Sequence, residues 1–203
     1  MRAPLRPIPD LLTPRLRLRR CEGGDLDFLH VHWTDPRVRR FLWDDEGITR
    51  ERVAEAIRAS AESFDAHGYG LWIVLARETS ARIGVCGLRP ASWADELEII
   101  YSLTPERWRS GFTVEAARAV LAHAFGTLFL ARIVAATNPP NAASVCTLER
   151  LGMRFERRAD LDGLETLFYS MSHNDFGNAS LHDSPPRARS RRGVEQPGSS
   201  SGS

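Results

Sequence analysis

The turn at residues 109–113 runs directly into an apolar-striped helix that has no proline and no Ser or Asp cap at its start. The first N–H groups of a helix lack intrahelical partners and, with the helix dipole, they attract anions such as phosphate. Gly111 lets the backbone approach an oxygen closely, and Arg109 adds a charge-assisted contact. The turn therefore suits phosphate binding. A connecting turn without a ligand has the same composition, and both interpretations stay open.

Two familiar phosphate loops are excluded by spacing. No Gly-Lys-Ser or Gly-Lys-Thr follows the turn, which rules out a Walker-type nucleotide site. The chain also lacks a G-x-G-x-x-G sequence, so a dinucleotide-binding fold has no support.

The elements around the turn follow from hydrophobic periodicity. Residues 97–103 form an apolar strand before it, and the helix over 111–125 carries an apolar stripe that docks on a sheet. Further strands are predicted at 16–19, 71–75, 82–88, 132–137, 153–156 and 167–171, and helices at 25–33, 49–67 and 142–151. Strands 71–75 and 82–88 are predicted to form a hairpin. Helices before, between and after strands predict a mixed sheet covered on both faces.

Composition limits the class of protein. The 203 residues, 42% of them hydrophobic, suit one domain, which we place at 11–175, followed by a disordered Ser/Pro/Arg/Gly-rich tail at 177–203. No apolar run is long enough to span a membrane, and no secretory signal precedes the domain. Three scattered cysteines predict a reducing, cytoplasmic location and no metal site. A net charge of +1 gives no field to attract nucleic acid, although all 27 basic residues are arginines.

Four segments, in this order and spacing, resemble the GNAT superfamily of acyl-CoA-dependent N-acetyltransferases. They are LLTPRLRLRR, RIGVCGL, ELEIIYSLTPERWRSGFTVEAARAVLAHAF and NAASVCTLERLGM, within residues 11–172. The residues of these segments resemble those of the branch that contains the ribosomal-protein N-terminal acetyltransferases. The resemblance implies an α+β fold with a mixed, mostly antiparallel sheet of about seven strands, helices on both faces, and a splay between strands 97–103 and 132–137.

The resemblance also implies a site for acetyl-CoA as co-substrate. The amides of residues 109–114 are expected to hold its pyrophosphate, and the strand at 99–101 to pair with the thioester-bearing arm. The expected coenzyme-binding residues are Ile99, Ile100, Tyr101, Arg109, Ser110, Gly111, Phe112, Thr113, Asn138 and Asn141. Three of them depart from the family pattern, because Arg109 stands where Gly is common, Thr113 where Gly or Ala is usual, and Ile100 where Gly is usual. The bulk of Ile100 is expected to narrow the space beside the acetyl group.

Two residues are the expected catalytic groups. An alkylammonium has a pKa of about 10, so only about one amine in a thousand is nucleophilic at pH 7, and a nearby carboxylate would correct this. Glu98, at the acidic position of the motif, is the candidate base; alternatively it pairs with an arginine. Ser144 is expected beside the coenzyme sulfur, although a serine in a first helical turn also needs no catalytic role. Asn141 is a good helix cap, and we interpret Cys146 as a packing residue.

The sequence says less about the amine that would accept the acetyl group. Trp33, Phe41, Trp43 and Trp72 are candidates to line an amine pocket, with the acidic residues 44–46 drawing a cation, although such aromatics are more often core. The acceptor is a protein N-terminus or a small amine, and homodimerisation stays open. The alternatives are a non-catalytic acyl-CoA-binding relative that acts as a sensor, and nucleic-acid binding by the tail.

Overall fold

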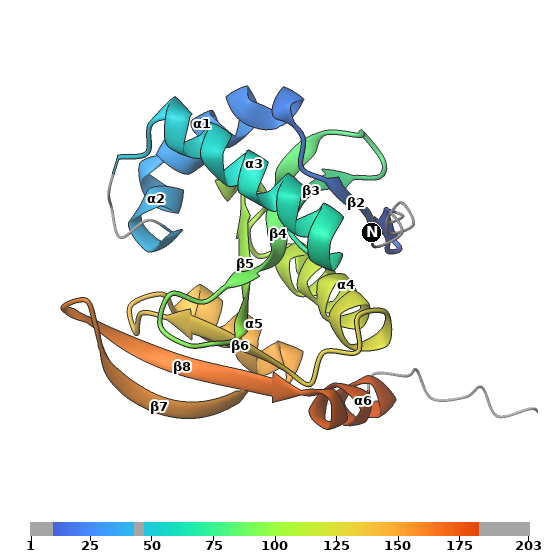
Figure 1. Ribbon diagram of the computed structural model, residues 1–203, viewed down its shortest axis with the longest axis vertical. Coiled ribbons are helices and arrows are strands. Elements are labelled where there is room, and N and C mark those ends of the chain that lie inside the picture. Colours follow the sequence, from blue (N-terminus) through green and yellow to red (C-terminus); the bar gives the residue numbers. More distant parts are fainter. Residues whose placement is uncertain (1–9, 43–46, 183–203) are drawn as a thin grey trace, which may run out of the picture.

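One eight-stranded sheet organises the part of the chain that the structure, a computed structural model, describes, which is residues 10–42 and 47–182 (Figure 1). The strand order is β1-β2-β3-β4-β5-β6-β8-β7. The strands are β1 (Leu11–Leu12), β2 (Leu16–Arg20), β3 (Leu71–Ala76), β4 (Arg82–Pro90), β5 (Leu97–Leu103), β6 (Arg132–Thr137), β7 (Arg154–Leu161) and β8 (Leu164–Ser172). All neighbours are antiparallel except β5 and β6. The mixed, mostly antiparallel sheet is therefore confirmed.

The parallel pair β5 and β6 is joined at a single position. Glu98 pairs with Val134, and no other register pair joins the two strands within the described residues. Beyond Glu98 the strands diverge, so the edge of β5 that faces β6 is open from this point. The expected splay between strands 97–103 and 132–137 is confirmed.

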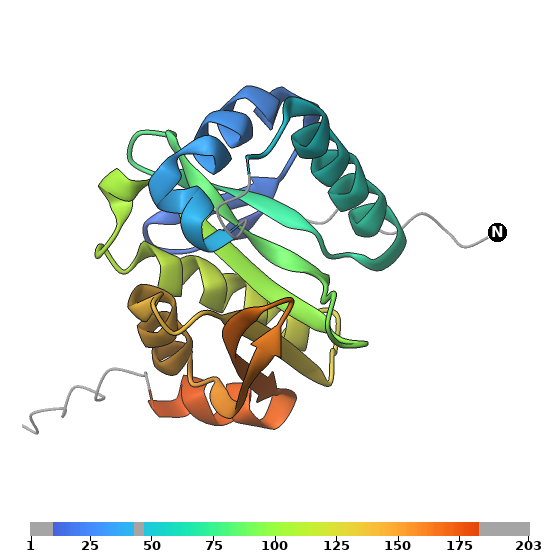
Figure 2. The same cartoon turned by 90° about the vertical axis from the view of Figure 1, so that its left-hand side faces the viewer.

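Six α-helices of the described residues cover the sheet. They are α1 (Leu26–Thr34), α2 (Pro36–Leu42), α3 (Arg50–His67), α4 (Phe112–Gly126), α5 (Ala142–Leu151) and α6 (His173–His182). Figures 1 and 2 show α1, α2 and α3 gathered on one side of the strands β3 to β5. Helices α4 and α5 pack against each other on the other side. None of these helices is both long and apolar enough to cross a membrane.

Each face of the sheet has its own apolar cluster. Buried residues of α4 and α5 pack with alternate residues of the strands, among them Trp72 and Ile99. The opposite cluster joins α1 and α3 to Leu71, Ile73 and Val85. Because side chains alternate across a strand, neighbouring residues such as Leu71 and Trp72 serve different clusters.

Local signals explain why the main helices begin and end where they do. Thr49 caps α3 by accepting the N–H of Arg52 at 3.3 Å, and Gly68 ends it in the left-handed conformation. Asn141 caps α5 by accepting the N–H of Ser144 at 3.2 Å. Helix α4 differs, because Gly111 at its start has a φ of 78° and no side chain caps the helix.

The structure adds to or extends the expected elements in four places. Helix α2 and the two-residue β1 were not expected, and β1 is the eighth strand. Strand β7 is longer than expected. It is almost fully exposed, so its sequence shows no apolar alternation from which its length could be predicted. The chain turns from β7 into β8 at Asp162 and Gly163. Helix α6 runs to His182 and so includes residues 177–182 of the expected tail, anchored by Phe176 against the core. The tail from 183 onward lies outside the described residues.

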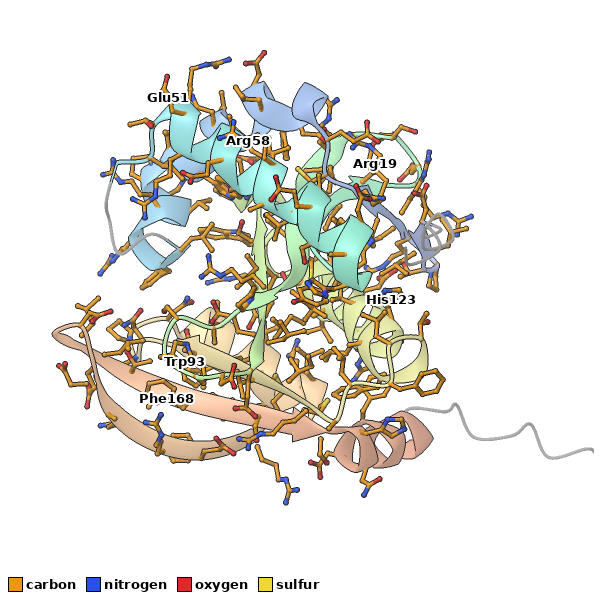
Figure 3. All side chains as sticks on the ribbon, in the orientation of Figure 1. Arg19, Glu51, Arg58, Trp93, His123 and Phe168 are labelled. Carbon is orange, nitrogen blue, oxygen red and sulfur yellow. The ribbon has the colours of Figure 1, made fainter. Side chains whose placement is uncertain are left out.

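A ring contact ties the two halves of the splayed sheet together. Trp93, in the connection between β4 and β5, meets Phe168 of β8 edge to face with 4.7 Å between ring centroids (Figure 3). Because Phe168 is paired with Ala136 of β6, the contact spans from the β4–β5 hairpin to the β6–β8 side of the gap. This ring contact stabilises the end of the gap where β5 and β6 are paired, and it leaves the end where the two strands diverge unfilled.

Candidate functional site

The turn before α4 carries a row of unused backbone donors. Within residues 10–42 and 47–182, the N–H groups of Arg109, Ser110, Gly111, Thr113 and Val114 have no hydrogen-bond acceptor. The N–H of Phe112 is only weakly engaged, at 3.4 Å from Ser110 Oγ. Five free donors at a helix start form a ready anion site, because the helix dipole adds to them.

The backbone of this turn is shaped for that purpose. Arg109 has a φ of 57° and Gly111 a φ of 78°, both in the left-handed region. Alternating right- and left-handed residues turn successive N–H groups toward one point, which makes a concave anion site. The Arg109 side chain is exposed, so its unusual backbone is held by the turn rather than by packing of the side chain.

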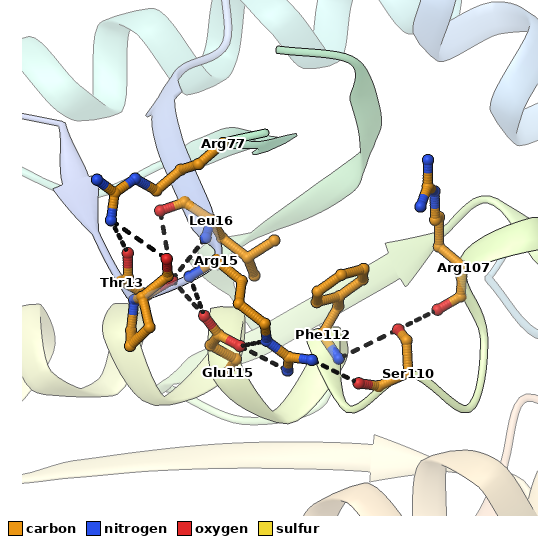
Figure 4. Close-up of polar contacts among 9 residues, drawn as sticks. Thr13, Arg15, Leu16, Arg77, Arg107, Ser110, Phe112 and Glu115 are labelled. Atoms are coloured by element: carbon orange, nitrogen blue, oxygen red, sulfur yellow. Dashed lines mark hydrogen bonds and ion pairs between the residues drawn. The ribbon is translucent and has the colours of Figure 1, made fainter. Parts of the chain in front are cut away.

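Two early residues hold the turn from below, as Figure 4 shows. Arg15 donates to Ser110 O at 3.0 Å and to Glu115 Oε2 at 2.6 Å, and Thr13 donates to Glu115 Oε1 at 2.6 Å. Partial burial acts to raise the pKa of Glu115, but the hydrogen bonds from Thr13 and Arg15 outweigh it and hold the pKa below its usual value. Thr13 and Arg15 stand in the segment LLTPRLRLRR, and no role was expected of either residue. Their function here is to fix the turn.

The surroundings of the turn are positively charged. A hollow of about 440 Å³ beside it is lined by Arg15, Arg77, Arg107 and Phe112, among others. Arg77 donates to Thr13 O at 2.7 Å, which fixes it at the rim. Three guanidinium groups at one hollow favour an anionic ligand near the open amides.

The open edge of β5 begins next to the turn. Thr104 N–H donates to Ile83 O of β4, and residues two apart in a strand point to the same side. The backbone groups of Ile100 and Ser102 therefore face β4, whereas those of Ile99 and Tyr101 face the gap toward β6. The structure thus brings the strand at 99–101 and the turn at 109–114 to one region, as expected.

Helix α5 lines the other side of the gap. Tyr101 Oη lies 3.0 Å from Ser144 Oγ, and either oxygen has the geometry to donate. Burial raises the pKa of Tyr101, and the hydrogen bond with Ser144 offsets part of this effect, so the phenol stays protonated. Helix α5 itself contains no tyrosine. Instead, Tyr101 of β5 places its phenol beside the first turn of α5. No local sequence pattern indicates this contact.

Glu98 lies at the vertex of the splay. It is 7% exposed, and Arg89, its cross-strand partner on β4, donates from Nε to Glu98 Oε1 at 2.7 Å. The pairing with an arginine that the sequence left open is therefore present, and Oε2 has no hydrogen bond with the described residues. Arg89 was not predicted, because its role depends on the register of β4 against β5.

A second cavity opens on the face of β5 that carries Ile100. It has about 150 Å³ and is lined by apolar and small residues of α1, α2, α3, β4 and β5, including Trp33, Leu42, Ala56, Ala59, Leu88 and Ile100. Ile100 thus borders this cavity instead of the coenzyme side, because its side chain alternates with those of Ile99 and Tyr101.

The remaining expected residues are placed as follows. Asn141 caps α5, and Asn138 donates to Glu165 O at 3.2 Å, which makes it a turn residue. Trp72 is wrong as a pocket residue, because it is fully buried against Phe64 in the cluster that includes α4 and α5. Cys146 is wrong as a packing residue, because it is exposed while Leu148 and Leu151 form the buried side of α5. Residues 43–46, including Trp43, lie outside the described residues.

Comparisons with known proteins match this geometry. Residues 15–154 match the model of the acetyltransferase (GNAT) domain. The chain is 30% identical over 151 residues to an uncharacterised N-acetyltransferase, p20, of Bacillus licheniformis, covering 72% of this chain and 83% of that protein.

Solved structures share the fold. An acetyltransferase from Agrobacterium tumefaciens superposes with a TM-score of 0.72 at 24% identity, over 84% of this chain and 98% of that one. RimL, a ribosomal L7/L12 α-N-protein acetyltransferase solved with coenzyme A, superposes with a TM-score of 0.68 at 15% identity, over 81% and 98%. With the family match over most of its length, the chain belongs to the GNAT acetyltransferase family.

Proposed function

We propose that this protein transfers an acetyl group from acetyl-CoA to a primary amine by direct attack of the amine. The observation that supports this most is the row of free N–H groups at residues 109–114, set beside the open edge of β5. The first N–H groups of any helix lack intrahelical partners, and here the donors of the preceding turn add to them beside a hollow lined by three arginines.

Several residues would hold the coenzyme. The amides of the turn would bind the pyrophosphate, and the groups of Ile99 and Tyr101 that face the gap would pair with the arm as a further strand would. Acetyl-CoA supplies the acetyl group as a thioester. The open N–H groups and the left-handed Gly111 fit a phosphate ligand, because Gly111 carries no Cβ and the side-chain atom nearest to where one would stand is the cationic Arg15 Nη2, 3.5 Å away.

Glu98 and Ser144 would handle the protons. The amine nitrogen forms a bond to the thioester carbon, the carbon–sulfur bond breaks, and the sulfur leaves with the electron pair. The nitrogen gives up a proton, for which Glu98 Oε2 is the acceptor, directly or through water. The leaving sulfur would take up a proton relayed from water through the Ser144 hydroxyl, which gives one proton to the sulfur and regains one from the water.

Tyr101 would orient Ser144. A phenol that stays protonated donates to Ser144 Oγ, which leaves the serine hydrogen free to point at the sulfur. Tyr101 is thus a positioning residue that acts through Ser144.

The test combines binding and turnover. We expect calorimetric titration of the full chain with acetyl-CoA to show binding, and thiol release to follow on addition of an amine. Glu98→Gln keeps an acceptor for Arg89 but removes the base, so it should lower the rate at pH 7 about 100-fold or more with unchanged acetyl-CoA affinity. Binding without release on any amine would favour the sensor alternative, and absence of binding would contradict the proposal.

A further inference from the structure

The cavity beside Ile100 and the ion pair at its edge form a single binding surface. Arg89 lines the cavity and holds Glu98, which projects from the same face of β5 as Ile100. One surface thus combines an apolar hollow, a cation and an anion, with the cation and anion 2.7 Å apart.

Both charged groups keep capacity for a ligand. The Arg89 side chain is 44% exposed, and its terminal nitrogens have no acceptor among the described residues. Glu98 uses only Oε1.

The apolar part has a definite size. A cavity of about 150 Å³ with apolar walls has room for one benzene-sized group. The small residues Ala56, Ala59 and Ser60 of α3 create this room, because larger side chains at these positions would fill it.

We propose that the acceptor is a free α-amino acid with a medium-sized apolar side chain, such as leucine, methionine or phenylalanine. The inference rests on the proposed function and names its substrate class. The ammonium group faces Glu98, the carboxylate faces the terminal nitrogens of Arg89, and the side chain enters the cavity. Both charges of the zwitterion are matched in this way, because guanidinium pairs bind carboxylates well. A protein N-terminus offers the ammonium group but no carboxylate next to it.

The experiment compares matched acceptors at saturating acetyl-CoA with the full chain. We expect kcat/KM for L-leucine to exceed that for L-leucinamide at least about 10-fold, because the amide lacks the charge that Arg89 binds. L-leucine should also exceed glycine, which leaves the cavity empty. A peptide with an N-terminal leucine should behave like the amide.

Variants separate recognition from general damage. Arg89→Gln should bring the ratio of the leucine and leucinamide rates close to one, whereas Arg158→Gln, an exposed strand arginine paired with Glu165, should leave the ratio unchanged. Ala59→Leu should reduce the preference for leucine over glycine by filling the cavity. Acetyl-CoA binding by each variant, measured by calorimetry, shows that it is folded.

The outcomes are distinguishable. An amide or a peptide that reacts as fast as or faster than the free acid overturns the inference and leaves the proposed function standing. An unchanged leucine-to-leucinamide ratio in Arg89→Gln also overturns it. No thiol release with any acceptor overturns the inference together with the proposed function.

Discussion

Helices α4 and α5 both begin beside the gap in the sheet, and they begin in opposite ways. Helix α5 is closed by its own sequence, because Asn141 accepts the N–H of Ser144. Helix α4 starts at a left-handed Gly111 with no side-chain cap and five free N–H groups in and beside its first turn. An uncapped start lowers helix stability, and it leaves the donors of α4 open to an anion in the way that the function proposed above requires.

The contrast also separates the tasks of the two helices. The open start of α4 leaves donors free for an anion, whereas the closed start of α5 fixes a single side chain, Ser144, at 3.0 Å from Tyr101 Oη. In the function proposed above, backbone groups would bind the charged part of the coenzyme at one helix, and a positioned hydroxyl would serve the reaction at the other.

The largest expected effect tests the open start. Gly111→Asp should weaken acetyl-CoA binding at least about 100-fold, because a new carboxylate would face the pyrophosphate. Calorimetry measures the affinity. Gly163→Asp is the matched control, since Gly163 also has a left-handed φ, 84° against 78°, and lies in the remote β7–β8 turn with open space around it. Equal affinities for the two variants would mean that the turn only connects β5 to α4.

The next effect tests the fixed hydroxyl at α5. Tyr101→Phe should lower kcat about 10-fold without changing acetyl-CoA affinity, because Ser144 loses the donor that orients it. Ser144→Ala combined with Tyr101→Phe should be no slower than Ser144→Ala alone. Tyr169→Phe is the control, because the hydroxyl group of the buried Tyr169 makes no hydrogen bond within the described residues. Independent, multiplying losses would show that Tyr101 does not act through Ser144.

A smaller effect tests the cap itself. Asn141→Ala should lower the free energy of unfolding by about 1 kcal/mol, the usual value of a side-chain cap, as should Thr49→Ala at α3. Urea unfolding measures both. Only Asn141→Ala should also weaken coenzyme binding, because α3 begins far from the gap. A coenzyme affinity that is the same in both variants would restrict Asn141 to capping.

The smallest effect concerns Arg109. Arg109→Gly keeps the left-handed turn but removes the guanidinium, so acetyl-CoA affinity should fall by a factor of about 3 to 10, and more so at low salt. The free energy of unfolding should change by less than about 1 kcal/mol, because relief of the left-handed strain offsets the flexibility of glycine. Asp162→Gly, with a φ of 53°, is the control for strain relief. Unchanged affinity at low salt would exclude a charge contact from Arg109.

Local sequence determined much of the fold. The bounds of β5, β6 and α5 agree with the predicted ranges, because apolar periodicity, Asn141 and the glycines at helix ends act within a few residues. The elements that were missed lack such signals. Strand β7 is too exposed to show a pattern, and α6 depends on the docking of Phe176 against the core.

The tertiary structure decided the contacts within the site. Glu98 meets Arg89 only because of the register of β4 against β5, and Tyr101 reaches Ser144, 43 residues away, across the splay. Thr13 and Arg15 fix the turn from about 100 residues upstream. The sequence by itself specified the open turn, the strand beside it and the family, because these are local patterns. Which side chains meet there depended on how distant elements pack, and no local pattern encodes that.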